Sequence, residues 1–237
     1  IMLREGLDAA RGCGIPAVVH VRELIQHDRA LVDVIGEPPE KIVSAVKERA
    51  DWIIGNSQCT AGTFRKIGRP CVVPNTVDCV SRELENKVSA REVRFGLISS
   101  NIHKKGLMDV VELARAAAKS CPKARFLVIG PETDLVGQIR KMQRDGEAPK
   151  NILFPGYATN PKDAISQVNV VLNFSHFAES FGRTVLEAMA ARRPVIAYEW
   201  GALPELVEHG KNGCLVPCKK PALAGTYVEA FCKDQKH

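Results

Sequence analysis

Two glutamates in the last third of the chain carry the first indication of chemistry. Glu179 and Glu187 have seven residues between them in ESFGRTVLEAMAA, the first before a Phe-Gly turn and the second among apolar residues. A charge among apolar neighbours is costly unless a polar group meets it. The nearest partner in the sequence is Arg183, one helical turn before Glu187, so one interpretation of Glu187 is a structural ion pair. The other interpretation is a carboxylate that meets a ligand.

The turn between the two glutamates has the features of an anion site. Gly182 allows the backbone to approach a ligand, and the helix that follows begins with free amides near Arg183 and Thr184. Such a helix start favours phosphate. Glu187 lies further along the helix, at about the reach from a diphosphate to a ribose, whose hydroxyls a carboxylate accepts. Glu179 would face a sugar on the other side, so the stretch predicts a nucleotide-sugar site.

Length and composition are those of a folded globular protein. The 237 residues are 45% hydrophobic and 25% charged, enough for one large or two modest domains. No apolar run is long enough to cross a membrane, and the first residues lack the apolar core of a signal peptide, so we expect a cytoplasmic protein. The net charge of +6 favours anionic partners and leaves peripheral contact with an anionic membrane surface open.

Several other function classes fit the sequence poorly. Aromatic residues make up only 5% of the chain, and no recognition-helix or zinc-finger motif is present, which argues against nucleic-acid binding. The eight cysteines are scattered through strand-like or helical segments, so we interpret them as thiols. Cys214 and Cys218 form a close pair without a second pair at zinc spacing, and we predict no metal site.

The strands and helices that position Glu179 and Glu187 alternate along the chain as in parallel βαβ units. Short runs rich in Val and Ile alternate with amphipathic stretches of ten or more residues. The polar stretch at 79–92 is typical of a linker. We therefore predict an α/β protein with one domain at 1–78, a linker at 79–92, and a second, alternating α/β domain at 93–237 with at least five parallel strands. The expected strands are 15–21, 50–57, 69–75, 93–99, 124–130, 151–157, 169–175, 194–198 and 214–217.

Open parallel sheets bind their ligands in the loops at the carboxyl ends of the strands. This rule gives the candidate residues a shared location. In the C-terminal domain these loops are expected at 99–106, 130–133, 155–157, 175–182 and 199–202.

The run from 179 to 217, ESFGRTVLEAMAARRPVIAYEWGALPELVEHGKNGCLVP, resembles the E-x7-E signature of the retaining glycosyltransferases of family four, which have the two-domain GT-B architecture. KKG at 104–106, and ADWIIGNSQ with VVPNTVD earlier in the chain, resemble further parts of that family. The resemblance implies metal-independent transfer of a sugar from a nucleotide-diphosphate sugar, with retention, to a saccharide or lipid-linked acceptor. It implies no cofactor besides this donor substrate.

The resemblance also implies roles for single residues. Glu187 is similar to the glutamate that holds the nucleotide ribose, and Glu179 to the one that contacts hydroxyls of the donor sugar. Lys105 would neutralise the departing diphosphate, and a solvated lysine is the alternative. The amides around Phe181, Gly182, Arg183 and Thr184 would take the distal phosphate.

Two further positions complete the candidate site. His20, expected at the end of its strand, is similar to a first-domain histidine that faces the donor sugar, and a structural histidine is the alternative. The loop at 154–157, with Gly156 and Tyr157, resembles the segment beside the base.

Three features depart from the family pattern. Ser99-Ser100 stand where the family usually has Gly-Arg, so Ser100 would meet the diphosphate without that arginine's charge, and donor affinity is expected to be low. Arg192 stands where a glycine usually ends a helix. The chain also begins and ends where relatives continue, which predicts a fragment or a truncated gene product. By the same resemblance, residues 1–78 are a partial, acceptor-side Rossmann-like domain, and residues 93–237 are the nucleotide-sugar donor-binding domain of the Rossmann-like type.

Two alternative functions follow from these departures and from the fold class. A non-catalytic nucleotide-sugar binding module would keep the ribose and phosphate contacts without turnover. A dinucleotide oxidoreductase is disfavoured, because the first loop of the second domain reads SSNIHKKG and contains no G-x-G-x-x-G.

Overall fold

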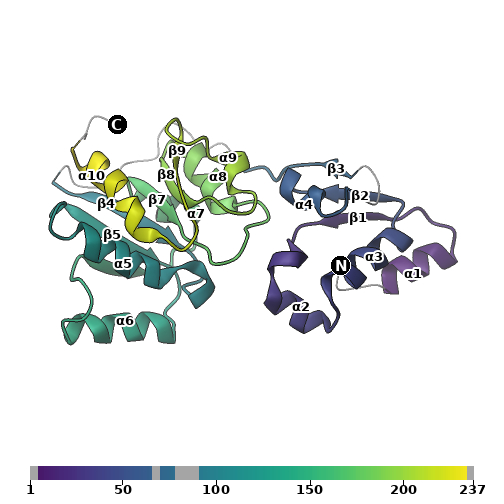
Figure 1. Ribbon diagram of the computed structural model, residues 1–237, viewed down its shortest axis with the longest axis horizontal. Helices are drawn as coiled ribbons and strands as arrows, with labels where there is room; N and C mark the ends of the chain where they lie inside the picture. The colour runs from purple at the N-terminus through teal and green to yellow at the C-terminus, as the bar shows by residue number, and fades with distance from the viewer. Residues whose placement is uncertain (1–4, 66–69, 78–90, 234–237) are drawn as a thin grey trace. The chain divides into compact units, whose positions relative to one another are not determined.

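The computed structural model describes residues 5–65, 70–77 and 91–233. The chain divides into two compact units (Figure 1). Unit 1 contains Ile1–Thr76 and Phe177–Gly182, and unit 2 contains Val77–His176 and Arg183–His237. Both units are built from parallel strands and helices, so the predicted α/β class is confirmed. Most of the expected linker at 79–92, with Cys79, lies outside the described residues.

Unit 1 is a small parallel sheet covered by helices. Its described strands have the order β1-β2-β3. In its core, Val19 and Val21 of the first strand, β1 (Val18–Val21), pack with Val43 and Val46 of helix α3 (Pro39–Arg49) and with Phe64. The elements are α1 (Glu5–Gly12), β1 (Val18–Val21), η1 (Ile25–His27), α2 (Arg29–Ile35), α3 (Pro39–Arg49), β2 (Trp52–Gly55), α4 (Gln58–Gly62) and β3 (Cys71–Val72).

Unit 2 is a larger, doubly wound sheet. Within the described residues it has six parallel strands in the order β6-β5-β4-β7-β8-β9. The elements are β4 (Val93–Ile98), η2 (His103–Lys105), α5 (Leu107–Ala117), β5 (Ala124–Ile129), α6 (Asp134–Arg144), β6 (Ile152–Gly156), α7 (Pro161–Ser166), β7 (Val170–Asn173), α8 (Arg183–Ala190), β8 (Val195–Tyr198), α9 (Leu203–Leu206), β9 (Gly213–Val216), η3 (Pro221–Ala224) and α10 (Gly225–Lys233).

Successive side chains of the unit 2 strands enter two different cores. Phe126 and Val170 belong to a cluster with α5, α6 and α10, whereas their chain neighbours Leu127 and Val171 belong to a cluster with α7, α8 and α9. This period of two buries both faces of the sheet, which explains why its strands are continuously apolar. Helices therefore cover both faces of the sheet, and polar side chains are placed at the two ends of its strands.

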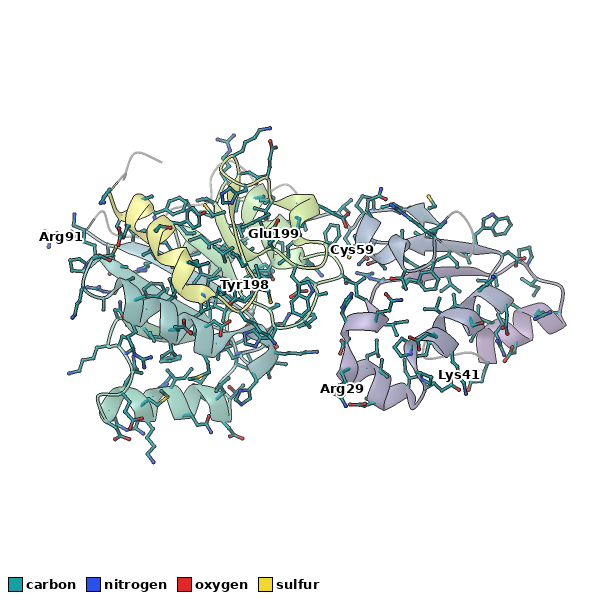
Figure 2. All side chains as sticks on the ribbon, in the orientation of Figure 1. Arg29, Lys41, Cys59, Arg91, Tyr198 and Glu199 are labelled. Carbon is teal, nitrogen blue, oxygen red and sulfur yellow. The ribbon has the colours of Figure 1, made fainter. Side chains whose placement is uncertain are left out.

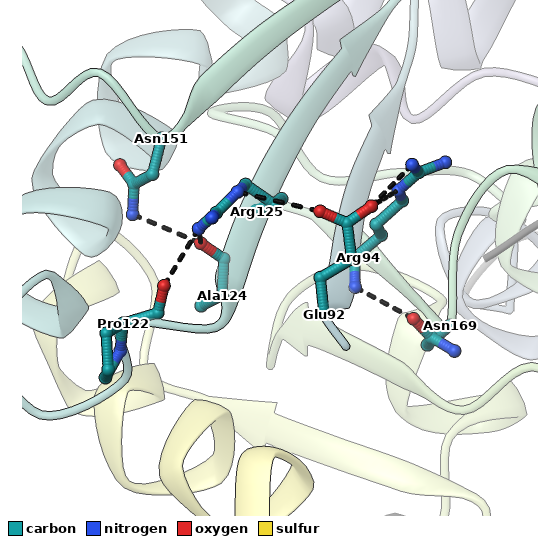
Figure 3. A network of polar contacts seen from close by, with 7 residues as sticks. All are labelled: Glu92, Arg94, Pro122, Ala124, Arg125, Asn151 and Asn169. Atoms are coloured by element: carbon teal, nitrogen blue, oxygen red, sulfur yellow. Dashed lines mark hydrogen bonds and ion pairs between the residues drawn. The ribbon is translucent and has the colours of Figure 1, made fainter. Parts of the chain in front are cut away.

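Charged groups cluster at the amino ends of β4 and β5 (Figure 3). Glu92 accepts hydrogen bonds from Arg94, with Nε at 2.6 Å, and lies 3.6 Å from Nε of Arg125. The backbone N–H of Arg94 donates to Oδ1 of Asn169 at 2.8 Å. These contacts tie adjacent strands together at the end opposite to the expected ligand loops.

Several elements are shorter than predicted. β1 begins at Val18 rather than at residue 15 and ends at Val21 as expected, so His20 is its next-to-last residue. β3 contains only Cys71 and Val72. Proline and polar residues flank both strands and limit the ladder. The helix after KKG begins at Leu107, because Lys105 belongs to the preceding 3-10 turn.

Two predictions about composition can be compared with the described residues. In the part of the chain that the structure describes, seven cysteines carry thiols rather than disulfides, as predicted. Among the helices described, none combines the length and the apolar character that a bilayer crossing requires.

Arg192, which stands where a glycine usually ends the helix, adopts a conformation that favours glycine at the end of α8. The N–H of Arg193 donates to the carbonyl of Ala188 at 2.9 Å, and the N–H of Arg192 donates to that of Met189 at 2.9 Å. This is a Schellman motif, which places Arg192 in the left-handed region with φ of 55°. Glycine adopts this conformation without steric cost, whereas arginine does not.

We predict that Arg192→Gly raises the free energy of unfolding of unit 2 by about 0.5 to 1 kcal/mol, because the relief of strain exceeds the added chain entropy. Urea unfolding of the full chain measures the change. Arg192→Ala is the matched control: it also removes the exposed side chain but keeps the strained conformation. Equal stability of the two variants would show that the conformation of residue 192 does not matter.

Candidate functional site

A cleft of about 370 Å³ opens at the carboxyl ends of the unit 2 strands. Its lining comes from the loops after β4, β5 and β6 and from helices α7 and α8. The lining residues are Ile98, Ser99, Ser100, Ile129, Gly130, Pro131, Tyr157, Ala158, Thr159, Pro161, Ala164, Thr184 and Glu187. The rule for open parallel sheets therefore locates this cleft correctly.

Asn101 joins the first two of these loops. Its side-chain amide donates to the carbonyl of Pro131 at 3.0 Å, and its own carbonyl accepts from the hydroxyl of Thr133 at 2.8 Å. Asn101 is 1% exposed and has φ of 54°, a conformation that asparagine tolerates better than most residues. The loop after β4 is thus fixed against the loop after β5, on one side of the cleft.

Glycines permit close contacts at two of the loops. A Cβ on Gly130 would lie 2.0 Å from the carbonyl oxygen of Ser99, and a Cβ on Gly106 would lie 2.1 Å from that of Phe174. Gly106 also has φ of 78°. The turn that carries Lys105 therefore lies directly against the backbone that leaves β7. No other residue type fits either position without moving a strand end.

Glu187 sits on the side of the cleft formed by α8. Its Oε1 accepts a hydrogen bond from Nε of Arg183 at 2.9 Å, so the predicted structural ion pair is present. The Glu187 side chain is 15% exposed and that of Arg183 is 71% exposed. A mostly exposed partner contributes little to stability, and a carboxylate has acceptor sites beyond the one that Arg183 uses. The ion pair and a ligand contact are therefore compatible.

The structure brings together part of the predicted site. Ser100, Tyr157, Thr184 and Glu187 line the cleft. Gly156 adjoins it, because its carbonyl accepts from the N–H of Gly130 at 3.0 Å. Arg183 begins α8 and is paired with Glu187. Lys105 belongs to η2, in the loop after β4, and its side chain is half-buried.

The remaining predicted residues belong to unit 1. His20 lies on β1 and its side chain is exposed. Glu179, Phe181 and Gly182 lie in the segment Phe177–Gly182, which groups with unit 1. Gly182 has φ of 90°, as its role in the turn requires. Their roles toward a sugar or a phosphate stay predictions.

Sequence reasoning missed a polar group beside this site. Asp109 of α5 is 8% exposed, His176 follows β7, and Tyr198 ends β8. Nε2 of His176 lies 2.6 Å from Oδ2 of Asp109, which also accepts a hydrogen bond from the Tyr198 hydroxyl. A signal was present, because Asp109 falls between Leu107 and Val110 on the apolar stripe of its helix. A carboxylate at such a position needs partners.

The C-terminal part of the chain matches a known family. The sequence profile described as Glycosyl transferases group 1 matches residues 93–233, more than half of the chain. This segment covers all elements of unit 2 from β4 to α10.

Individual proteins show the same similarity. The chain is 30% identical over 122 residues to the poly(ribitol-phosphate) alpha-N-acetylglucosaminyltransferase of Staphylococcus aureus (strain COL), covering 51% of this chain and 24% of that protein. It is 31% identical over 134 residues to the alpha-monoglucosyldiacylglycerol synthase of Acholeplasma laidlawii, covering 55% and 33%. The aligned segment thus spans about a quarter to a third of these relatives.

Solved structures share the fold over almost the whole chain. Anabaena HepE, in complex with UDP and glucose, superposes with a TM-score of 0.77 at 22% identity, covering 99% of this chain and 67% of that one. The sucrose-phosphate synthase of Thermosynechococcus elongatus gives 0.75 at 19% identity, covering 97% and 61%. At these identities the similarity shows the fold.

We predict that Gly106→Ala destabilises unit 2 by about 2 to 4 kcal/mol, because a Cβ there meets the Phe174 carbonyl and the left-handed φ is costly for alanine. Gly137→Ala is the matched control, since Gly137 lies inside α6 with no atom near its Cβ position. That variant is expected to gain about 0.5 to 1 kcal/mol from helix propensity. Equal unfolding midpoints in urea would contradict the close packing of the two loops.

Proposed function

The chain belongs to the glycosyl transferases group 1 family, and from that premise we propose that it is the donor-binding part of a retaining, metal-independent glycosyltransferase. The observation that carries the proposal is the cleft at the carboxyl ends of the strands, lined by both Thr184 at the start of α8 and Glu187 one turn later. This pairing offers a helix start to a phosphate and a carboxylate to a ribose.

In this proposal the protein acts mainly through electrostatics. The first amides of α8 and the ammonium group of Lys105 stabilise the negative charge that grows on the diphosphate as the bond to the sugar breaks. Glu187 accepts hydrogen bonds from the ribose hydroxyls and fixes the nucleotide along the helix. The acceptor hydroxyl attacks the anomeric carbon on the face that the diphosphate leaves, and its proton passes to the departing diphosphate, so the configuration is retained.

The relatives indicate which ligands to test first. HepE is described in complex with UDP and with UDP-glucose, so UDP is the first nucleotide to test. The relatives are named for transfer to poly(ribitol-phosphate) and for synthesis of a glucosyl lipid, so we propose a saccharide or lipid-linked acceptor. Ser100 lines the cleft without a positive charge, which supports weak donor binding and keeps a non-catalytic binding module as the second candidate.

We predict that the chain binds UDP with an affinity that a metal chelator does not change. Glu187→Ala should weaken binding of both UDP and uridine by about 1.5 to 3 kcal/mol, or roughly 10- to 150-fold, because both ligands carry the ribose. Isothermal titration calorimetry measures UDP directly, and competition measures the weaker uridine.

Glu208→Ala is the matched control for this experiment. Glu208 forms an ion pair with Lys211 at 2.8 Å, and it does not line the cleft. Its loss is expected to leave both affinities unchanged. Equal affinities in the Glu187 variant and the wild type would remove the ribose role, and Glu187 would then serve only its ion pair with Arg183. Turnover with a sugar acceptor separates the enzyme from the binding module.

A further inference from the structure

His176 holds both ends of the turn that carries Lys105. Its backbone N–H donates to the carbonyl oxygen of Lys104 at 2.8 Å. Its ring Nε2 lies 2.6 Å from Oδ2 of Asp109, in the first turn of α5. Lys105 and Gly106 lie between these two attachment points. One residue of the loop after β7 thus fixes the segment from residue 104 to residue 109.

The carboxylate at one end of this segment is itself firmly held. Asp109 is 8% exposed, and besides His176 it accepts a hydrogen bond from the hydroxyl of Tyr198. Tyr198, labelled in Figure 2, is the last residue of β8. Burial and this hydrogen bond raise the pKa of the Tyr198 hydroxyl, so it remains a donor at neutral pH. Asp109 therefore has a fixed position to which His176 can attach.

The turn that carries Lys105 is also restrained by the close packing of Gly106 against Phe174. Gly106 approaches Phe174 so closely that a Cβ would lie 2.1 Å from the Phe174 carbonyl oxygen. Phe174 and His176 belong to the same stretch of chain, so the turn is held against that stretch by packing and by two polar contacts. A shift of residues 174–176 must therefore move Lys105 as well.

We propose that His176, anchored by Asp109, is a positioning residue that sets the placement of Lys105 toward the diphosphate of the donor. The inference rests on the proposed function, in which Lys105 meets that diphosphate. His176 acts through the turn and does not touch the nucleotide. Its side chain is 32% exposed, so removing it uncovers little core, and the expected effect is a local one.

The test uses the ratio of the affinity for UDP to the affinity for uridine, which isolates the contribution of the diphosphate. Lys105→Ala sets the scale by lowering this ratio. His176→Ala should lower the ratio at least fivefold, while the affinity for uridine changes less than twofold. His176→Gln should restore most of it, because the glutamine side-chain amide can place a donor near the position of the histidine Nε2.

Ile139→Val is the matched control for a merely structural effect. It removes one buried methyl group from α6, in the core that α6 shares with α5, so it should lower the unfolding temperature and leave the ratio unchanged. All variants are measured in the full chain, with folding checked by circular dichroism.

Four outcomes overturn the inference. An unchanged ratio in His176→Ala, beside a lowered ratio in Lys105→Ala, means that His176 has no positioning role. A ratio that falls equally in Ile139→Val means that the effect is one of stability. UDP binding that Lys105→Ala leaves intact removes the group that His176 would position. Absence of UDP binding by the wild type removes the proposed function together with this inference.

Discussion

The burial of both faces of the unit 2 sheet is the constraint on which the rest of this unit depends. Side chains that alternate between two cores, such as Phe126 with Leu127 and Val170 with Val171, require helices on both sides of the sheet. Polar groups are then confined to the two ends of the strands. At the amino ends, Glu92 and Asn169 join neighbouring strands. The carboxyl ends carry the loops, and it is there that the cleft opens.

The loops around this cleft are held in place by contacts with one another. Asn101 connects the loops after β4 and β5, and Gly106 packs on the backbone after β7. Preorganised donors stabilise developing charge better than mobile ones, because they need not reorganise when the charge appears. The proposed site depends on one helix start, one lysine and one carboxylate, so the fixed geometry of its loops matters more than the number of its contacts.

The succession of strands and helices along the chain and the location of the cleft could be predicted from the sequence. The hydrophobic period of an element is a local property, and the rule that ligands bind at the carboxyl ends of parallel strands is general. The sequence also identified Glu187, Thr184, Ser100 and Tyr157, which line the cleft. The sequence did not reveal that Glu187 can pair with Arg183 and still line the cleft, because this depends on how exposed the two side chains are in the fold. The Asp109, His176 and Tyr198 group was missed because its members are far apart in the sequence and meet only through the fold.

The proposed function requires that the cleft at the carboxyl ends of β4, β5 and β6 binds a nucleoside diphosphate. A crystal structure of the chain grown with UDP shows where the nucleotide binds. We expect the ribose hydroxyls within hydrogen-bond distance of the Glu187 carboxylate and a phosphate at the first amides of α8, near Thr184. UDP bound elsewhere on unit 2, or bound in the cleft with its ribose away from Glu187, would refute the proposed donor site.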